Sequence, residues 1–159
     1  MTYNDRPLIS ASTILGMGMG GFVDGILFHQ IFQLHNMLSN RVPKVNLVNM
    51  EINMFWDGIF HAFTWIMTAI GLWLFWRAMN RDKVPKQIKT FVGSLFLGWG
   101  LFNLIEGIID HYVIQLHHVV ENLGLSIFDL LFLASGVIMI IVGQRLIQAG
   151  RKGIQKSII

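Results

Sequence analysis

Long apolar stretches alternate with short polar connections along the whole chain. Four of them, at about residues 9–35, 53–79, 88–115 and 125–148, are long enough to cross a bilayer, because roughly 20 apolar residues in a helix span its hydrocarbon core. Backbone groups in lipid must be hydrogen-bonded within their own segment, which favours helices over loops. The pattern therefore predicts an all-α integral membrane protein, a four-transmembrane-helix bundle that forms a single transmembrane domain over residues 1–159.

The composition supports this fold class and narrows the chemistry. Hydrophobic residues make up 53% of the chain and charged residues 13%, whereas soluble proteins have about 25% charged residues. The sequence contains no cysteine, which excludes disulfides and thiolate metal ligands. Any protein-bound metal would then be held by His, Asp, Glu or Met.

Basic residues mark one side of the membrane. Ten of the 12 Lys and Arg residues lie in or near the two termini and the connection 80–87, and only Arg41 and Lys44 lie in the connection 36–52. The positive-inside rule places the basic side in the cytoplasm. We therefore expect a multi-pass protein of the bacterial inner (plasma) membrane with both termini cytoplasmic. Basic residues gathered at helix ends do not form a nucleic-acid-binding surface.

The first and third apolar stretches are related by an internal repeat with an offset of 82 residues. SASTILGMGMGGFVDGILFHQIFQLH (10–35) aligns with FVGSLFLGWGLFNLIEGIIDHYVIQLH (91–117). The matched positions include Gly16, Gly18, Asp24, Gly25, His29, Gln33 and His35, which recur as Gly98, Gly100, Glu106, Gly107, His111, Gln115 and His117. Because the two stretches run in the same direction, the repeat predicts two pseudo-symmetric helical hairpins. The glycines allow close contact between helices in lipid.

Ionisable side chains crowd the outward halves of the four stretches. They are Asp24, His29, His35, Asp57, His61, Glu106, Asp110, His111, His117 and Asp129. No Lys or Arg lies at their depth, and charges in hydrocarbon are costly unless they are paired. Like charges without counter-ions must be protonated, separated by water or neutralised by a bound ion. We therefore predict that these residues bind one or two transition-metal ions, since imidazole and carboxylate groups are common metal ligands.

Helical geometry predicts which of these side chains act together. At about 100° per residue, Asp57 and His61 lie one turn apart on one face, a common way for a helix to offer two ligands. His29 and His111 lie about 140° from the acid of their own helix, so we expect them to reach into neighbouring grooves. These four residues, together with Asp24 and Glu106, are the predicted principal ligands. Asp57 and Asp129 correspond in a weaker echo between the second and fourth stretches.

The remaining histidines lie at or beyond the predicted helix ends. His35 and His117 are expected to be outer ligands or gates of the site. His118 and Glu121 are expected to lie in a solvated connection, 116–124, without a role.

The identity of the metal is open from the sequence. Copper, iron and zinc all accept such ligands, and Met50 and Met54, on the outward extension of the Asp57 face, would suit Cu(I). A haem held by His29 and His111 is an alternative, although the surplus of carboxylates argues against it.

The same polar residues leave functions other than metal binding open. A proton or metal-ion transporter would need polar residues that continue to the cytoplasmic side, and the apolar stretches offer there only Ser12, Thr68 and Ser94. A purely structural polar network is a further possibility. A metal-dependent enzyme and a metal carrier remain open alternatives.

Three stretches carry a family resemblance: GGFVDGILFHQIFQLHNML, WDGIFHAFTW and GWGLFNLIEGIIDHYVIQLHHV. They resemble a family of small bacterial predicted membrane proteins of unknown function, with DGIxxH and EGIxDH motifs, over about residues 12–145. Some relatives look as if they occur beside, or fused to, cytochrome oxidase assembly proteins. The resemblance implies redox chemistry or metal handling linked to respiration, with a respiratory-oxidase or metal-delivery partner, and leaves a homo-oligomer open.

Overall fold

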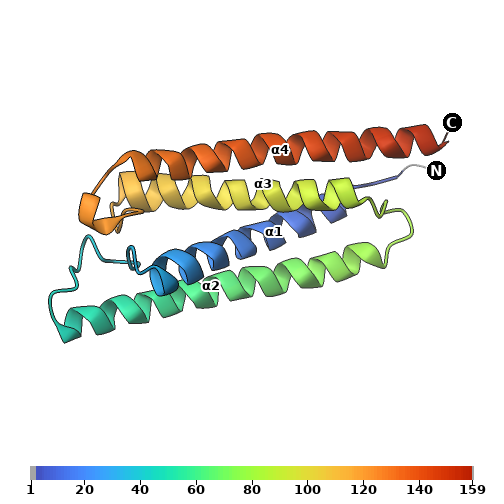
Figure 1. The fold of residues 1–159 in the computed structure, drawn as a ribbon. Helices are drawn as coiled ribbons and strands as arrows, with labels where there is room; N and C mark the ends of the chain where they lie inside the picture. Colours follow the sequence, from blue (N-terminus) through green and yellow to red (C-terminus); the bar gives the residue numbers. More distant parts are fainter. Residues whose placement is uncertain (1–2, 159) are drawn as a thin grey trace.

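The computed structural model describes residues 3–158, with side chains as far as Gln155. The described chain is helical and contains no strand (Figure 1). The long helices are α1 (Arg6–Val23), α2 (Leu47–Met79), α3 (Ile88–Glu106) and α4 (Ile127–Ile158), and the short ones are the π-helices η1 (Asp24–Ile31) and η2 (Gly107–Val113) and the 3-10 helix η3 (Glu121–Leu123). Residues 1–2 and 159, at the ends of the predicted domain, and the side chain of Lys156, one of the predicted cytoplasmic basic residues, lie outside the described part.

Four helical segments are long and apolar enough to cross a membrane, as predicted. They run over Arg6–Ile31, Leu47–Met79, Ile88–Val113 and Ile127–Gln155. The second begins earlier than the predicted residue 53, because Asn46 caps α2: its side chain accepts a hydrogen bond from the backbone N of Asn49 at 2.9 Å. Polar residues that the sequence assigned to a connection therefore form the first turns of α2.

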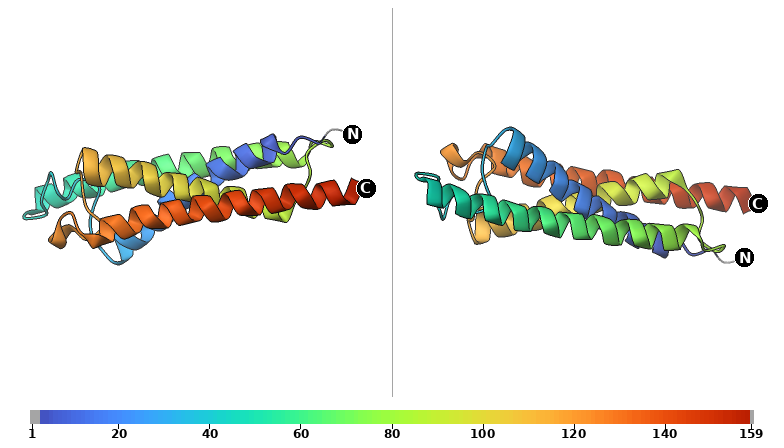
Figure 2. Two further views of the ribbon diagram at one scale, coloured as in Figure 1. Left: turned by 90° about the horizontal axis from the view of Figure 1, so that it is seen from above. Right: turned by 90° about the horizontal axis from the view of Figure 1, so that it is seen from below.

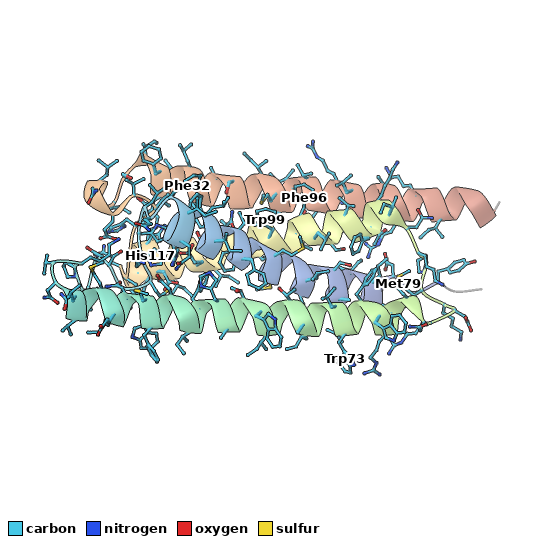
Figure 3. The ribbon with its side chains drawn as sticks, turned by 60° about the horizontal axis from the view of Figure 1, so that its bottom comes forward. Phe32, Trp73, Met79, Phe96, Trp99 and His117 are labelled. Carbon is cyan, nitrogen blue, oxygen red and sulfur yellow. The ribbon has the colours of Figure 1, made fainter. Side chains whose placement is uncertain are left out.

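The helices α1 and α3 lie at the centre of the bundle, and α2 and α4 flank them. α1 packs against both α2 and α3, and α3 packs against α4, which gives the order α4, α3, α1, α2 across the molecule (Figures 1 and 2). The most apolar windows of α1 and α3 are 50% and 44% buried, compared with 11% and 17% in α2 and α4. The outer helices present apolar residues such as Trp73 to their surroundings (Figure 3), as expected for contact with lipid.

Two glycines set the crossing of α1 and α3. A Cβ atom on Gly16 would clash with the backbone carbonyl of Leu95, and a Cβ atom on Gly98 would clash with the carbonyl of Thr13. Both pairs of partners are related by the offset of 82 residues. Small residues permit this close approach of helix backbones.

The first and third spans end earlier than predicted. η1 ends at Ile31 and η2 at Val113, whereas the sequence predicted helix to residues 35 and 115. Gln33 and Gln115 follow with φ values of 50° and 53°, a left-handed conformation that breaks the helix and turns the chain. The residues after each turn fold back over the bundle end that lies opposite the two termini (Figure 1).

Candidate metal centre

Each π-helix brings a histidine onto the acid of its own helix. In a π-helix the backbone bonds span five residues, so side chains five positions apart lie close together. His29 Nε2 lies 3.3 Å from Asp24 Oδ2, and His111 Nε2 lies 3.1 Å from Glu106 Oε1. The predicted separation of about 140° within each pair assumed α-helical geometry. It is wrong because both segments are π-helical.

The other ring nitrogen of each of these histidines contacts an acid on the adjacent outer helix. His29 Nδ1 lies 2.9 Å from Asp57 Oδ1 on α2, and His111 Nδ1 lies 3.1 Å from Asp129 Oδ1 on α4. Each half of the protein therefore contains an acid–imidazole–acid chain. Both ring nitrogens of each histidine therefore face carboxylates, and the two contacts together fix the orientation of the ring.

Backbone amides hold the two outer acids in place. Asp57 accepts a hydrogen bond from the backbone N of Met37 at 2.7 Å. Asp129 accepts one from the backbone N of Val119 at 3.1 Å and one from that of Ser126 at 2.8 Å. With their oxygens engaged by backbone and imidazole, Asp57 and Asp129 orient the histidines.

His35 and His117 lie at the centre of the site, and their predicted place at its outer edge is wrong. The turns at the ends of η1 and η2 fold both side chains into the bundle, where they are 0% and 1% exposed. Figure 3 shows His117 among the helices. Their rings stack with centroids 4.5 Å apart and planes 9° apart. His35 Nδ1 lies 3.0 Å from the carbonyl O of Val119, and His117 Nδ1 lies 3.1 Å from that of Met37.

Ligand atoms from both halves therefore converge. Two groups of three side chains have ligand atoms within 4.8 Å of one another: His29, His35 and His117, and Glu106, His111 and His117. In the described part of the chain, seven buried atoms of the cluster lack an aligned hydrogen-bond partner. Two of them, His111 Nδ1 and His118 Nδ1, face Asp129, and the other five are candidate ligand atoms: Asp24 Oδ2, His29 Nε2, His35 Nε2, Glu106 Oε2 and His111 Nε2. Buried polar atoms nearly always have a partner, and a bound cation would provide one.

The site has four buried carboxylates without a basic partner. They are at most 6% exposed and belong to Asp24, Asp57, Glu106 and Asp129. Within residues 3–155 all their ion-pair partners are histidines, and none is Lys or Arg. The charge of the site therefore favours a bound cation.

The electrostatics of the two central histidines differ. Burial lowers the pKa of His35, as do the nearby His117 and His29. His35 is therefore a neutral imidazole with a free lone pair at pH 7. Burial is also the largest single effect on His117 and lowers its pKa, but the hydrogen bond with Glu106, 2.9 Å long, and the charge of that carboxylate together outweigh burial and raise the pKa of His117.

Some predicted site residues do not join this cluster. His61 is half-buried, and its Nδ1 lies 2.7 Å from the backbone O of Asp57 in its own helix. Asp110 is half-buried and lines a neighbouring groove. Met50 and Met54 are 44% and 67% exposed, so the predicted methionine face points away from the site. The face shared by Asp57 and His61 in sequence is not a shared ligand face, because Asp57 contacts His29.

The sequence predicted a solvated connection at 116–124, but part of it is buried. His118 was expected in solvent but is only 4% exposed, and its Nδ1 lies 3.5 Å from Asp129 Oδ1. The repeat contained the signal, since His118 aligns with Asn36, whose side-chain amide donates to Asp57 at 2.5 Å. Glu121 is also engaged: it accepts a hydrogen bond from the hydroxyl of Ser39 in the other connection.

Comparison with known proteins gives one match. A family model described as Predicted membrane protein (DUF2243) matches residues 11–150, a range that includes every residue of the site. The comparisons with curated proteins and with solved structures give no match.

Proposed function

Because the chain belongs to the DUF2243 family of membrane proteins, we propose that it is a multi-pass metalloprotein that holds two transition-metal ions in the outward half of its bundle. One observation carries the proposal. Four buried histidines each turn Nδ1 toward an oxygen atom, and in three of them Nε2 contacts a carboxylate that we propose as a further ligand: Asp24 beside His29, and Glu106 beside His111 and His117. Metal-ligating histidines usually have such an acceptor behind them, because it sets the tautomer and the direction of the ring.

The ligands divide into two equivalent sets. Under the internal repeat, Asp24, His29 and His35 of the first half correspond to Glu106, His111 and His117 of the second half. The ligand atoms of the second set lie within 4.8 Å of one another, whereas those of His29 and His35 lie within 4.8 Å of His117. Each set contains two imidazoles and one carboxylate, the donor set of non-haem iron(II) sites that keep open positions. Two divalent ions would also balance the four buried carboxylates. Among iron, copper and zinc, this donor set favours iron.

Recurring contacts support the equivalence of the two sets. The contact pairs that match under the internal repeat are Gly16–Leu95 with Gly98–Thr13, His29–Asp57 with His111–Asp129, and His35–Val119 with His117–Met37. A pseudo-two-fold axis between His35 and His117 accounts for all three. In this arrangement each half supplies one ligand set, and a backbone oxygen of each half holds the central histidine of the other half in place.

The burial of the centre favours a resident ion over a transported or delivered one. Its ligands are almost wholly enclosed. A haem held by His29 and His111 is less suited, because haem iron has no use for the carboxylates of Asp24 and Glu106 that lie beside these two rings. A resident ion would supply Lewis-acid or redox chemistry for a small substrate. We place the centre near the outer face of the bacterial inner membrane.

Elemental analysis of protein purified from membranes in mild detergent tests the proposal. We expect about two metal ions per chain in the wild type, and a loss of most of the metal in the His35→Ala/His117→Ala variant, because each ligand set loses an imidazole. His61→Ala is the matched control: it removes a half-buried histidine outside the cluster and should keep the metal. Optical spectra of the same samples separate haem, by its Soret band, from a histidine–carboxylate iron centre.

Retained metal in a folded His35→Ala/His117→Ala variant would contradict the proposed ligands. If the His61→Ala variant loses its metal and the His35→Ala/His117→Ala variant keeps it, the metal is bound at His61 and not by the proposed cluster. Size-exclusion chromatography on each sample shows whether the variant is folded.

A further inference from the structure

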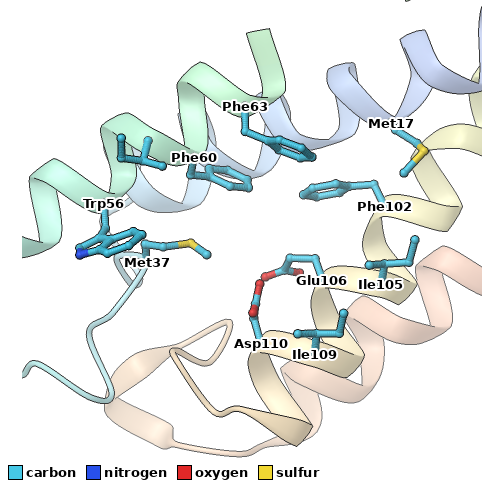
Figure 4. A pocket seen from close by; sticks show the side chains of 11 residues that line it. Met17, Met37, Trp56, Phe60, Phe63, Phe102, Ile105, Glu106, Ile109 and Asp110 are labelled. Atoms are coloured by element: carbon cyan, nitrogen blue, oxygen red, sulfur yellow. The ribbon is translucent and has the colours of Figure 1, made fainter. Parts of the chain in front are cut away.

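An apolar groove lies beside the proposed centre, between α2 and α3. Its volume is about 380 Å³, and its lining includes the aromatic side chains of Trp56, Phe60, Phe63 and Phe102. Figure 4 shows the rings of Phe60, Phe63 and Phe102 on one side of the space and the carboxyl groups of Glu106 and Asp110 on another. Apolar pockets of this size with a few polar groups are typical of small-molecule sites.

The groove opens sideways, toward the surroundings of the helices. In the described part of the chain α2 and α3 do not pack against each other, so the space between them is closed from behind by α1, which contributes Met17. Lining residues Ile59, Phe63 and Ile105 are 47%, 54% and 48% exposed, and all three lie within the membrane-spanning segments. A ligand would therefore enter from the hydrocarbon of the bilayer.

Two carboxylates with oxygens that accept no hydrogen bond from the described residues form the polar end of the groove. Glu106 Oε1 lies 2.9 Å from His117 Nε2, but its buried Oε2 has no partner among the described residues. The Asp110 carboxylate, one turn further along, makes no hydrogen bond in the described part of the chain either. Unpaired acceptors at the end of an apolar space indicate a ligand that donates hydrogen bonds.

The internal repeat places a second, smaller groove on the other side of the bundle. Its volume is about 190 Å³, and Asp24, Phe28, Trp99 and Phe132 are among the residues that line it. Phe28 occupies the position that corresponds to Asp110. The second groove therefore has one carboxylate and a phenyl ring where the first has two carboxylates, and it has half the volume, so the groove between α2 and α3 is the better site for a ring with a polar group.

We propose that the groove between α2 and α3 binds a lipid-soluble molecule that carries a hydroxyl group on an aromatic ring, with the hydroxyl at Glu106 and Asp110. This inference rests on the proposed function, for which it names a substrate class. The ring would pack against the aromatic lining, and the volume suits one ring and part of an alkyl chain, since a cavity of about 150 Å³ holds benzene. A hydroxyl donates to a carboxylate and keeps lone pairs for a metal ion, whereas an ammonium group has none.

Binding of 4-octylphenol to the purified protein in dodecyl maltoside micelles tests the proposal. The matched probe is 4-octylanisole, its methyl ether, which has the same ring and chain but no donor. We expect one phenol per chain by isothermal titration calorimetry and binding of the ether at least about tenfold weaker, because a hydrogen bond to a charged acceptor is lost.

Two variants locate the binding site. Ile105→Trp fills the groove and should abolish binding of the phenol. The control is Ile108→Trp in η2, at a position that is 47% exposed and outside the groove lining, and it should leave binding unchanged. Asp110→Asn removes one acceptor with little change of shape, should weaken binding of the phenol about tenfold, and keeps the proposal testable if Ile105→Trp does not fold.

Metal content measured on the same samples separates the two proposals. The groove is supported if the wild type binds the phenol more tightly than the ether and Ile105→Trp or Asp110→Asn loses this preference. If the same protein contains no metal, the groove is still supported and only the proposed metal centre fails. Equal binding of phenol and ether, or binding unchanged in both variants, overturns the proposed ligand whatever the metal content.

Discussion

His35 and His117 each contact the opposite half of the bundle at its centre. Each imidazole turns Nδ1 toward a backbone oxygen of the other half, that of Val119 for His35 and that of Met37 for His117, and the two rings stack 4.5 Å apart. Neither half can orient its own central histidine without the other. The geometry of the site therefore depends on the packing of the two hairpins.

The first prediction concerns the helix crossing on which that packing depends. Gly98→Leu should destabilise the folded protein by about 1–3 kcal/mol or more, because the added side chain meets the backbone carbonyl of Thr13, which has no room to move. The control is Gly58→Leu, at a position with no neighbouring atom within 4 Å. Thermal unfolding in detergent measures both. Equal melting temperatures for the two variants would show that the crossing tolerates a side chain.

The second prediction concerns the outer acids behind the ligands. Asp57→Asn and Asp129→Asn should each weaken metal binding about 10- to 100-fold, because an amide holds the imidazole less firmly than a carboxylate does. In Asp57→Asn the backbone N–H of Met37 can still donate to the amide oxygen. In Asp129→Asn the single amide oxygen keeps one of the two backbone hydrogen bonds, from Val119 or Ser126, so thermal unfolding of this variant is measured alongside. Metal titration measures the affinity, and Glu51→Gln, at an exposed position, is the control. Unchanged affinity in both variants would place the metal elsewhere.

The third prediction concerns the orientation in the membrane. The chain has no cysteine, so single cysteines report without background. Lys44→Cys, in the exposed part of the connection after η1, should react with a membrane-impermeant maleimide added to intact spheroplasts, and Lys83→Cys, between α2 and α3, should react only after lysis. The reverse labelling pattern would invert the topology and place the site on the cytoplasmic side.

Much of the architecture follows from local sequence. Four apolar runs predict four helices because lipid offers the backbone no other hydrogen-bond partner. The repeat predicts equivalent roles for Asp24 and Glu106, and for His29 and His111, and these residues form matching contacts. The absence of Lys and Arg near the buried acids is also visible in the sequence, and it is this imbalance that points to a cation. The link to respiratory assembly proteins and the oligomeric state stay predictions.

Which side chains form the centre became clear only from the tertiary structure. An α-helical projection separates His29 from Asp24 and pairs Asp57 with His61, whereas the π-helix η1 joins His29 to Asp24 and lets it reach Asp57 on α2. Likewise, turns at positive φ after η1 and η2 bring in His35 and His117 from segments that the sequence assigned to helix ends.

The sequence by itself determined which side chains are available, at what depth they lie and in which half of the repeat they occur, because hydropathy and charge act locally along a helix. Only the tertiary structure decided which of them meet. A change from α- to π-helical bonding rotates every later side chain, and a single left-handed residue reverses the chain, so small backbone differences that leave little trace in hydropathy select the ligands.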